Sequence, residues 1–234
     1  MIVSANHPSF LPSLAYLDKM AKSDLFVVMD DIPFEADRFT HRQRIKIADG
    51  AGWLTIPTTR GEDDRVLATR IDHEVAWRRR TWLAIETHYG TAPHFARYAD
   101  ELREVFATRW ERVLDLDLHL LELARGWFRI HVPIVRASSL DLAGTGTERM
   151  IDLCKKVGAH GFLAGGDAVD DEAMGRAGMR LIWQHFEHPV YAQRYAELGF
   201  IANLGFLDLL LNHGPASRDM LLPRSHPMRA STIG

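Results

Sequence analysis

The sequence contains very little cysteine, and this scarcity excludes several classes of protein. Cys154 is the single cysteine among 234 residues, so the chain cannot hold an internal disulfide framework or a paired-cysteine metal or redox site. Cys154 lies in the middle of a predicted helix, without the helix N-terminus or adjacent imidazole that a nucleophilic thiol needs. We therefore interpret it mainly as a small packed side chain.

An excess of charge and long apolar runs are also missing. The formal charge is −3, from 28 basic and 31 acidic residues, so no global attraction to nucleic acid or to an anionic membrane is expected. The N-terminus MIVSANHPSF has neither the basic start of a signal peptide nor the length of a membrane anchor. The sequence predicts a cytoplasmic protein with no membrane insertion and no nucleic-acid partner.

Short catalytic motifs are absent as well. We find no HExxH, GxSxG, Walker or zinc-ribbon pattern, and we expect no metal site. The three arginines of WRRRTW, residues 77–82, spread around a helix, which favours a solvated or salt-bridged face over a nucleic-acid patch. The glycines of FLAGGDAV follow a predicted strand and can let a ligand approach the backbone, but they lack the spacing of a dinucleotide-binding loop.

The composition is that of a folded protein. Hydrophobic residues make up 47% and charged residues 25% of the chain, and this length is enough to bury a sizeable core. We expect a single α/β domain over residues 1–220, followed by a polar, mobile tail at residues 221–234.

Strands and helices are predicted to alternate. MIVSA and LFVVMDD read as strands on either side of the helix SLAYLDKMAKSD, and VPIVRASSL, TGTERMIDLCKKVGA and HGFLAGGDAV give a second strand–helix–strand unit. This alternation indicates a mostly parallel central sheet flanked by helices. A helical insertion is expected around residues 76–129, broken near residues 90–93, and IKIADGAGWLTIPT reads as a hairpin.

The first candidate site lies where two predicted strands end. Asp30 and Asp31 follow the apolar run LFVVM, and His7 follows MIVSA. Because the carboxyl ends of parallel strands meet at one edge of a sheet, we expect these three side chains at one rim. The two carboxylates can orient a histidine, accept from an amine or hold Mg²⁺; the alternative is capping of the next turn.

A row of cations follows in the sequence. Arg42, Arg44 and Lys46 alternate, so in an extended segment they lie on one face, where like charges call for an anion. A phosphate, a carboxylate or the Asp30–Asp31 pair can provide it. The alternative is a solvated strand face.

Two polar groups near the C-terminal end complete the candidates. His188, Tyr191 and Gln193 lie in EHPVYAQ, although a histidine beside a proline often holds a backbone group instead of a substrate. Asp208 and Asn212 are four residues apart on a predicted helix and share a face. In an apolar setting that pair needs a partner, which is either a ligand or the backbone of a neighbouring loop.

An ordered set of segments resembles the WbqC-like protein family. The resemblance covers residues 3–220 and is carried by HPSFLPSLAYLDKMAKSDLFVVMDDIPF, FTHRQRIK, GWLTIP, TERMIDLCKKVGA, EHPVYAQ and LDLLLNHGP. The sequence departs from the family pattern at His7, Phe39, His41 and Gln43, where Gln, Trp, Asn and Asn are usual. His7 therefore adds a base that relatives lack.

The resemblance implies a bacterial biosynthetic enzyme. The family looks like proteins encoded with O-antigen, other surface-polysaccharide or secondary-metabolite genes, and its name-giving member is described as a glycine transferase acting on an amino sugar. This implies acyl or aminoacyl transfer to a small-molecule amine, such as an amino sugar or amino acid. The cosubstrate is then an activated acyl donor: a thioester of CoA or of a carrier protein, an aminoacyl group or an adenylate.

Roles for the candidate residues follow from amide formation. We expect His188 or His7 to deprotonate the amine, with Asp31 orienting the imidazole, and Tyr191 and Asn212 to donate to the developing oxyanion. The residues expected to bind substrate are Asp30, Arg42, Arg44, Lys46, Gln193, Asp208 and Asn212. The alternatives are a nucleotide-using ligase or nucleotidyltransferase-like enzyme, and a non-catalytic carrier- or sugar-binding protein.

Overall fold

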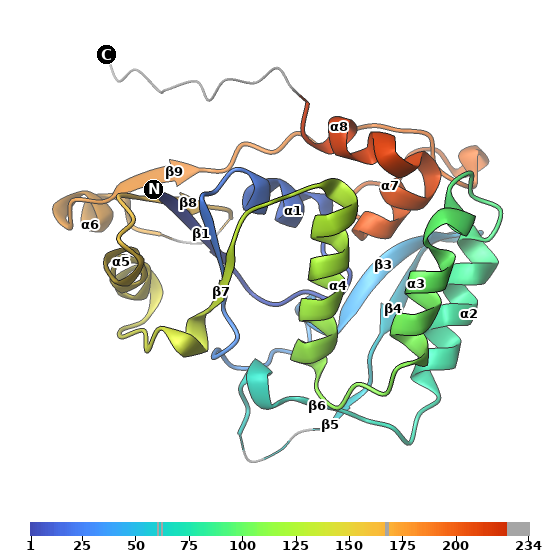
Figure 1. Ribbon diagram of the computed structural model, residues 1–234, viewed down its shortest axis with the longest axis horizontal. Coiled ribbons are helices and arrows are strands. Elements are labelled where there is room, and N and C mark those ends of the chain that lie inside the picture. The colour runs from blue at the N-terminus through green and yellow to red at the C-terminus, as the bar shows by residue number, and fades with distance from the viewer. Residues whose placement is uncertain (60, 62, 167–168, 224–234) are drawn as a thin grey trace.

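The protein is built on a five-stranded parallel sheet (Figure 1). We describe a computed structural model over residues 1–59, 61, 63–166 and 169–223. All four strand pairings are parallel, in the order β7-β2-β1-β8-β9. The strands are β1 (Ile2–Asn6), β2 (Leu25–Val28), β7 (Ile134–Arg136), β8 (Gly161–Ala164) and β9 (Arg180–Trp183). The expected α/β fold with a parallel central sheet is confirmed.

Both faces of the sheet are covered, and the side-chain alternation of β2 shows how. Phe26 and Val28 belong to one apolar core, whereas Val27 and Met29 belong to the other. Strands buried on both faces are continuous apolar runs, as LFVVM is. Helix α1 (Leu14–Ala21) contributes to the first core, and helices α5 (Gly146–Val157) and α6 (Asp171–Arg176) contribute to the second (Figure 1).

The helical insertion is also confirmed. It consists of α2 (Trp77–Tyr89), α3 (Phe95–Ala107) and α4 (Val113–Phe128), with the first break at the predicted place. The buried faces of these helices join the core that covers the α1 side of the sheet. Helix α7 (Phe206–His213) packs into the same core, with α8 (Ser217–Leu221) behind it.

A β-ribbon extends beside α7 and α2 (Figure 1). Strand β3 (Arg42–Ile47) pairs antiparallel with β4 (Gly50–Thr55), as the hairpin prediction required, and Arg44 lies opposite Trp53. A short antiparallel pair joins β5 (Thr58–Thr59) to β6 (Arg70–Ile71). The remaining elements are the short helices η1 (Val66–Ala68), η2 (Ala137–Ser139), η3 (Ala196–Leu198) and η4 (Gly214–Ala216).

The division into one domain and a tail stays a prediction. Leu221, at the start of the predicted tail, is buried against the larger core, and residues 224–234 lie outside the described residues. Across the parts of the chain that the structure describes, no helix has the length and apolar character needed to cross a lipid bilayer.

Candidate functional site

The strand order changes direction between β1 and β8. From β1 the chain first adds β2 and β7 on one side, and later β8 and β9 on the other. In open parallel sheets, ligands bind outside the carboxyl ends of the strands at such a reversal. His7 follows β1, Asp30 and Asp31 follow β2, and Gly165 follows β8, so the topology brings these residues to one edge of the sheet.

Asp30 is fully buried at this edge and is saturated with hydrogen bonds. Nε of Arg136 donates to its Oδ2 at 2.7 Å, and the backbone N–H and hydroxyl of Ser138 donate to its two oxygens at 2.9 and 2.7 Å. Burial raises the pKa of Asp30, but the bonds from Ser138 and the ion pair with Arg136 outweigh burial and lower the pKa below its ordinary value. Asp30 therefore stays ionised and holds Arg136 in place.

Asp31 is paired with a second arginine. Nη2 of Arg149, on α5, donates to Oδ2 of Asp31, and both side chains are mostly buried. Among the described residues, Oδ1 of Asp31 and Nε of Arg149 are inaccessible and have no hydrogen-bond partner. Unsatisfied buried polar atoms are rare, so this pair has hydrogen-bonding capacity that no described residue uses.

Arg136 and Arg149 were missed by sequence reasoning. Arg136 ends strand β7 and keeps 45% of its side chain exposed, and within the described chain its Nη atoms donate to no protein group. The signal available in the sequence was the position of Arg136 at the end of the predicted strand VPIVR. No local pattern marked Arg149, which lies within a helix.

Several predicted binding residues form a separate, buried group, which we call the interior polar cluster: Lys46, Tyr89, Gln193 and Asp208. Nζ of Lys46 donates to Gln193 Oε1 at 3.2 Å and to the carbonyl of Gly199 at 2.6 Å. The Tyr89 hydroxyl and Nε2 of Gln193 donate to the two oxygens of Asp208 at 2.8 and 2.7 Å. These bonds join β3, α2, α7 and the segment 191–201.

The charged groups of this cluster are buried, and the cluster supports the fold from inside. Lys46 and Asp208 are both 0% exposed, and burial raises the pKa of Asp208 although Tyr89, Tyr191, Gln193 and Lys46 favour its charged form. Burial, then the charge of Asp208, raises the pKa of Tyr191. Asn212 Nδ2 donates to the backbone carbonyl of Asp208 at 2.7 Å. Asp208 and Asn212 therefore find their partners in the backbone and among buried side chains.

His188 lies beside this cluster and is held by backbone. The N–H of Asn203 donates to its Nε2 at 3.2 Å, which places the ring proton on Nδ1, 2.9 Å from the carbonyl of Pro189. Its ring lies 6.3 Å from Tyr191 and 5.5 Å from Phe200. Both ring nitrogens are thus occupied, as in the structural alternative stated above.

The predicted pairing of Asp31 with His188 is not among the contacts of the described residues. Asp31 bonds to Arg149 and His188 bonds to backbone, and within the described residues no hydrogen bond, ion pair or ring contact joins His188 to Asp30 or Asp31. The residues expected in one pocket occupy two places: the carboxyl edge of the sheet, and the interior polar cluster with its surroundings.

The predicted cationic row, Arg42, Arg44 and Lys46, is likewise divided between two places. Lys46 is buried, whereas the guanidinium groups of Arg42 and Arg44 lie 4.7 and 5.8 Å from the ring centre of Trp53. Trp53 is 50% and Phe39 47% exposed, with ring centres 6.0 Å apart. Arg42 and Arg44 therefore form a cation–aromatic surface with the exposed rings of Trp53 and Phe39, whereas Lys46 is part of the core.

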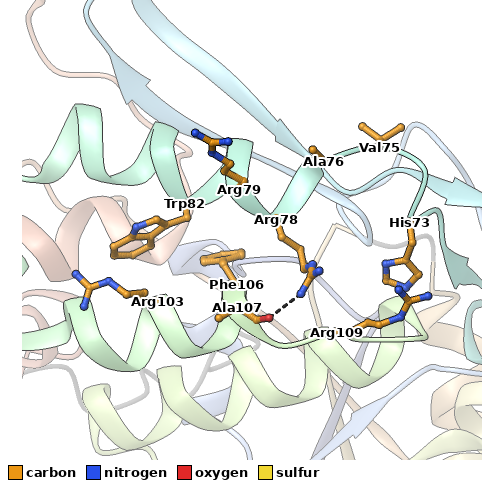
Figure 2. A pocket seen from close by; sticks show the side chains of 10 residues that line it. All are labelled: His73, Val75, Ala76, Arg78, Arg79, Trp82, Arg103, Phe106, Ala107 and Arg109. Atoms are coloured by element: carbon orange, nitrogen blue, oxygen red, sulfur yellow. Dashed lines mark hydrogen bonds between the residues drawn. The ribbon is translucent and has the colours of Figure 1, made fainter.

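Two further features concern possible ligand sites among the described residues. Among the described residues, no group of three or more histidine, cysteine, aspartate or glutamate side chains is arranged to hold a metal ion. A cavity of about 370 Å³ opens between α2 and α3, and its lining contains none of the residues described at the carboxyl edge (Figure 2).

The parallel strand order, with an apolar core on each face of the sheet, defines a doubly wound α/β protein. Within that class, residues 7–220 match the WbqC-like protein family, and the chain belongs to it. It is 29% identical over 227 residues to a Mycobacterium tuberculosis protein described as "Uncharacterized protein Rv1507c", a match covering 94% of this chain and 96% of that protein. No solved structure is significantly similar to the chain.

Proposed function

We propose that the protein is an enzyme that transfers an activated acyl or aminoacyl group to a small amine, with the reaction at the carboxyl edge of the sheet. The observation that carries the proposal is the pair of arginines, Arg136 and Arg149, anchored by Asp30 and Asp31 beside the end of β1. A buried carboxylate that holds a half-exposed guanidinium group gives a fixed cation that can bind a carboxylate, a phosphate or an oxyanion.

Each group at this edge has a proposed role in the reaction. The amine nitrogen attacks the carbonyl carbon and forms the C–N bond, while the bond to the leaving group breaks and a thiolate or phosphate departs with the electron pair. His7 is proposed to take the proton from the amine. Asp31 is proposed to hold Arg149 in place at this edge through its Oδ2.

Arg136 is proposed to stabilise the negative charge that develops on the carbonyl oxygen. Its Nε is used by Asp30, and its outer nitrogens remain for the substrate. The interior polar cluster and Asn212 are proposed to support the site through the fold, and Arg42 and Arg44 to contact the outer part of a donor. His188 and Tyr191 position the segment 191–201 in this proposal.

Mass spectrometry of product mixtures tests the proposal. The protein is offered thioester, aminoacyl and acyl-adenylate donors with amino sugars and amino acids, and amide products are sought. His7→Ala, Asp31→Asn and Arg136→Gln are each expected to lower turnover by about 10²-fold or more. His185→Ala and Arg176→Gln, at exposed ion pairs, serve as matched controls. Full turnover by all three edge variants would contradict the proposal.

A nucleotide-using ligase is the second candidate, and the strand order favours it. Numbered along the chain, the sheet runs third, second, first, fourth, fifth, the order in which doubly wound proteins bind nucleotides between the first and fourth strands. Gly165 and Gly166 follow the fourth strand, and Lys19 Nζ lies 3.4 Å from where a Cβ on Gly165 would be. This remains an analogy of fold.

Calorimetric titration with ATP and an assay for pyrophosphate release separate the two candidates. The ligase hypothesis predicts that the protein binds ATP. It also predicts that Gly165→Leu abolishes this binding, because the added side chain fills the space through which a ligand reaches the backbone. Amide formation from a pre-activated donor without ATP favours the transferase instead.

A further inference from the structure

The cavity between α2 and α3 is lined by cations that the function proposed above does not use. Arg78 and Arg79 come from the first turn of α2, Arg103 from the end of α3, and Arg109 from the loop that follows (Figure 2). Among the described residues, no aspartate or glutamate lines it. A cavity of about 370 Å³ with four arginines and no acid in its wall is suited to an anion.

Carboxylates of the protein neutralise only part of this positive charge. Arg103 pairs with Asp100, and Arg109 pairs with Glu111, at 2.7 and 3.2 Å. Arg78 donates to the carbonyl of Ala107 at 2.6 Å and meets no carboxylate. Arg79 makes no hydrogen bond or ion pair with the described residues. Two guanidinium groups are therefore left without a counter-ion.

The backbone adds positive potential at the same place. Helix α2 has 13 residues, and its N-cap, Ala76, supplies no side-chain acceptor for the first amides. Unpaired N–H groups and the helix dipole make such an end attractive to anions. His73 also lines the cavity, and in the described structure its Nε2 is inaccessible and has no hydrogen-bond partner.

Two aromatic side chains also line the cavity, Trp82 from α2 and Phe106 from α3 (Figure 2). Phe106 is 3% exposed, and the guanidinium group of Arg103 lies 5.2 Å from the ring centre of Trp82. The indole orients Arg103 by a cation–π contact. An anion bound by the arginines thus has an apolar surface beside it, which suits an ester better than a bare ion.

We infer that this cavity binds the phosphate group of a small organic phosphate. Two uncompensated guanidinium groups and an uncapped helix start match the double charge and several acceptor oxygens of a phosphate, and arginine binds phosphate with paired N–H donors. The sequence-based interpretation of WRRRTW as a solvated face holds for Arg80, which is exposed and lies outside the cavity. Arg79 is exposed as well, although it also lines the cavity, and Arg78 is only partly exposed.

Isothermal titration calorimetry at constant ionic strength, without divalent metal, tests the inference. Inorganic pyrophosphate and adenosine 5′-diphosphate are titrated into the full-length protein, and saturable binding to one site is expected. Arg79→Gln is expected to weaken binding by about tenfold or more, whereas its neighbour Arg80→Gln leaves it unchanged. Tighter binding of the nucleotide supports an organic phosphate, whereas equal or weaker binding of the nucleotide overturns the choice of an ester over an inorganic phosphate.

The carboxyl edge gives the second control. Arg136→Gln changes the edge site and is expected to leave pyrophosphate binding unchanged, so failure of this inference can be told apart from failure of the proposed function. The inference is overturned by the absence of saturable binding, by equal effects of Arg79→Gln and Arg80→Gln, or by binding that Arg136→Gln removes and Arg79→Gln preserves.

Discussion

At the scale of single residues, the most unusual group is Asp117. This side chain on α4 is almost wholly buried, and neither of its oxygens has a hydrogen-bond partner among the described residues. Burial raises its pKa well above the ordinary value. The hydroxyl of Tyr16, on α1, is likewise buried without a partner, and burial, then Asp117, raises the pKa of Tyr16.

A raised pKa makes Asp117 a source of pH-dependent instability. Stability is fully present below the pKa of the unfolded chain, about 3.9, and is lost as the pH rises through the folded value. We expect Asp117→Asn to raise the free energy of unfolding at pH 8 by at least about 1 kcal/mol, which is about 2–4 °C in Tm. Thermal melts between pH 3 and 8 check this, with the exposed Glu104→Gln as control. A variant less stable than wild type at pH 8 would refute it.

Asp30 is expected to behave in the opposite way. Its lowered pKa stabilises the fold above the pKa of the unfolded chain, and this stabilisation is lost as the pH falls through the folded value. Asp30→Asn removes the charge that holds Arg136 and should cost roughly 2–3 kcal/mol at pH 7. Urea denaturation should show this difference shrinking from pH 5 towards pH 2; an equal loss throughout that range would argue against an ionised Asp30.

At the scale of elements, the interior polar cluster joins parts of the chain that are distant in sequence. Lys46 on β3 is bonded to Gln193 and Gly199, and Gln193 also accepts from the N–H of Ile201 at 2.9 Å. Losing one member leaves the others buried without partners, which is costlier than never burying them. The cluster therefore fixes the irregular segment 191–201 against the β-ribbon.

We predict that Lys46→Met lowers the free energy of unfolding by roughly 1–3 kcal/mol, because Oε1 of Gln193 and the carbonyl of Gly199 lose a buried donor. Hydrogen exchange of the Ile201 amide should accelerate more than that of amides in the central sheet. Lys155→Met, at an exposed position on α5, is the matched control. Unchanged exchange at Ile201 would show that the segment is held by other contacts.

Sequence patterns predicted the helices and strands better than they predicted which distant residues contact one another. Apolar runs and helical spacing located β2 and the insertion, because burial on both faces and amphipathic helices leave local signatures. Arg136 and Arg149 lie 106 and 118 residues from the aspartates they bind, and only the strand order brings them together. Lys46 has the same strand parity as Arg42, yet it is buried because the segment 191–201 covers it, which parity alone cannot indicate.

At the scale of the whole molecule, one core joins the sheet to the helical insertion. Phe26 of β2, Leu102 of α3, Leu120 of α4 and Phe206 of α7 are all fully buried in it. Elements that share one core unfold together, since none of them can keep its apolar face covered alone.

We expect a single cooperative unfolding transition. Tryptophan fluorescence reports on the insertion through Trp77, Trp82, Trp110 and Trp127, and far-UV circular dichroism reports on the whole chain, so their urea curves should coincide. A chain lacking residues 76–129 should not fold. Two separate midpoints would show that the insertion is an independent unit.

The strand order also constrains how the protein is made. Strand β1 is synthesised well before its second neighbour, β8, which spans Gly161–Ala164. Until that segment leaves the ribosome, one edge of β1 has no native strand beside it, and unpaired strand edges favour association between chains. We expect truncated nascent chains that end before β8 to depend on chaperones, and the complete chain to be released from them.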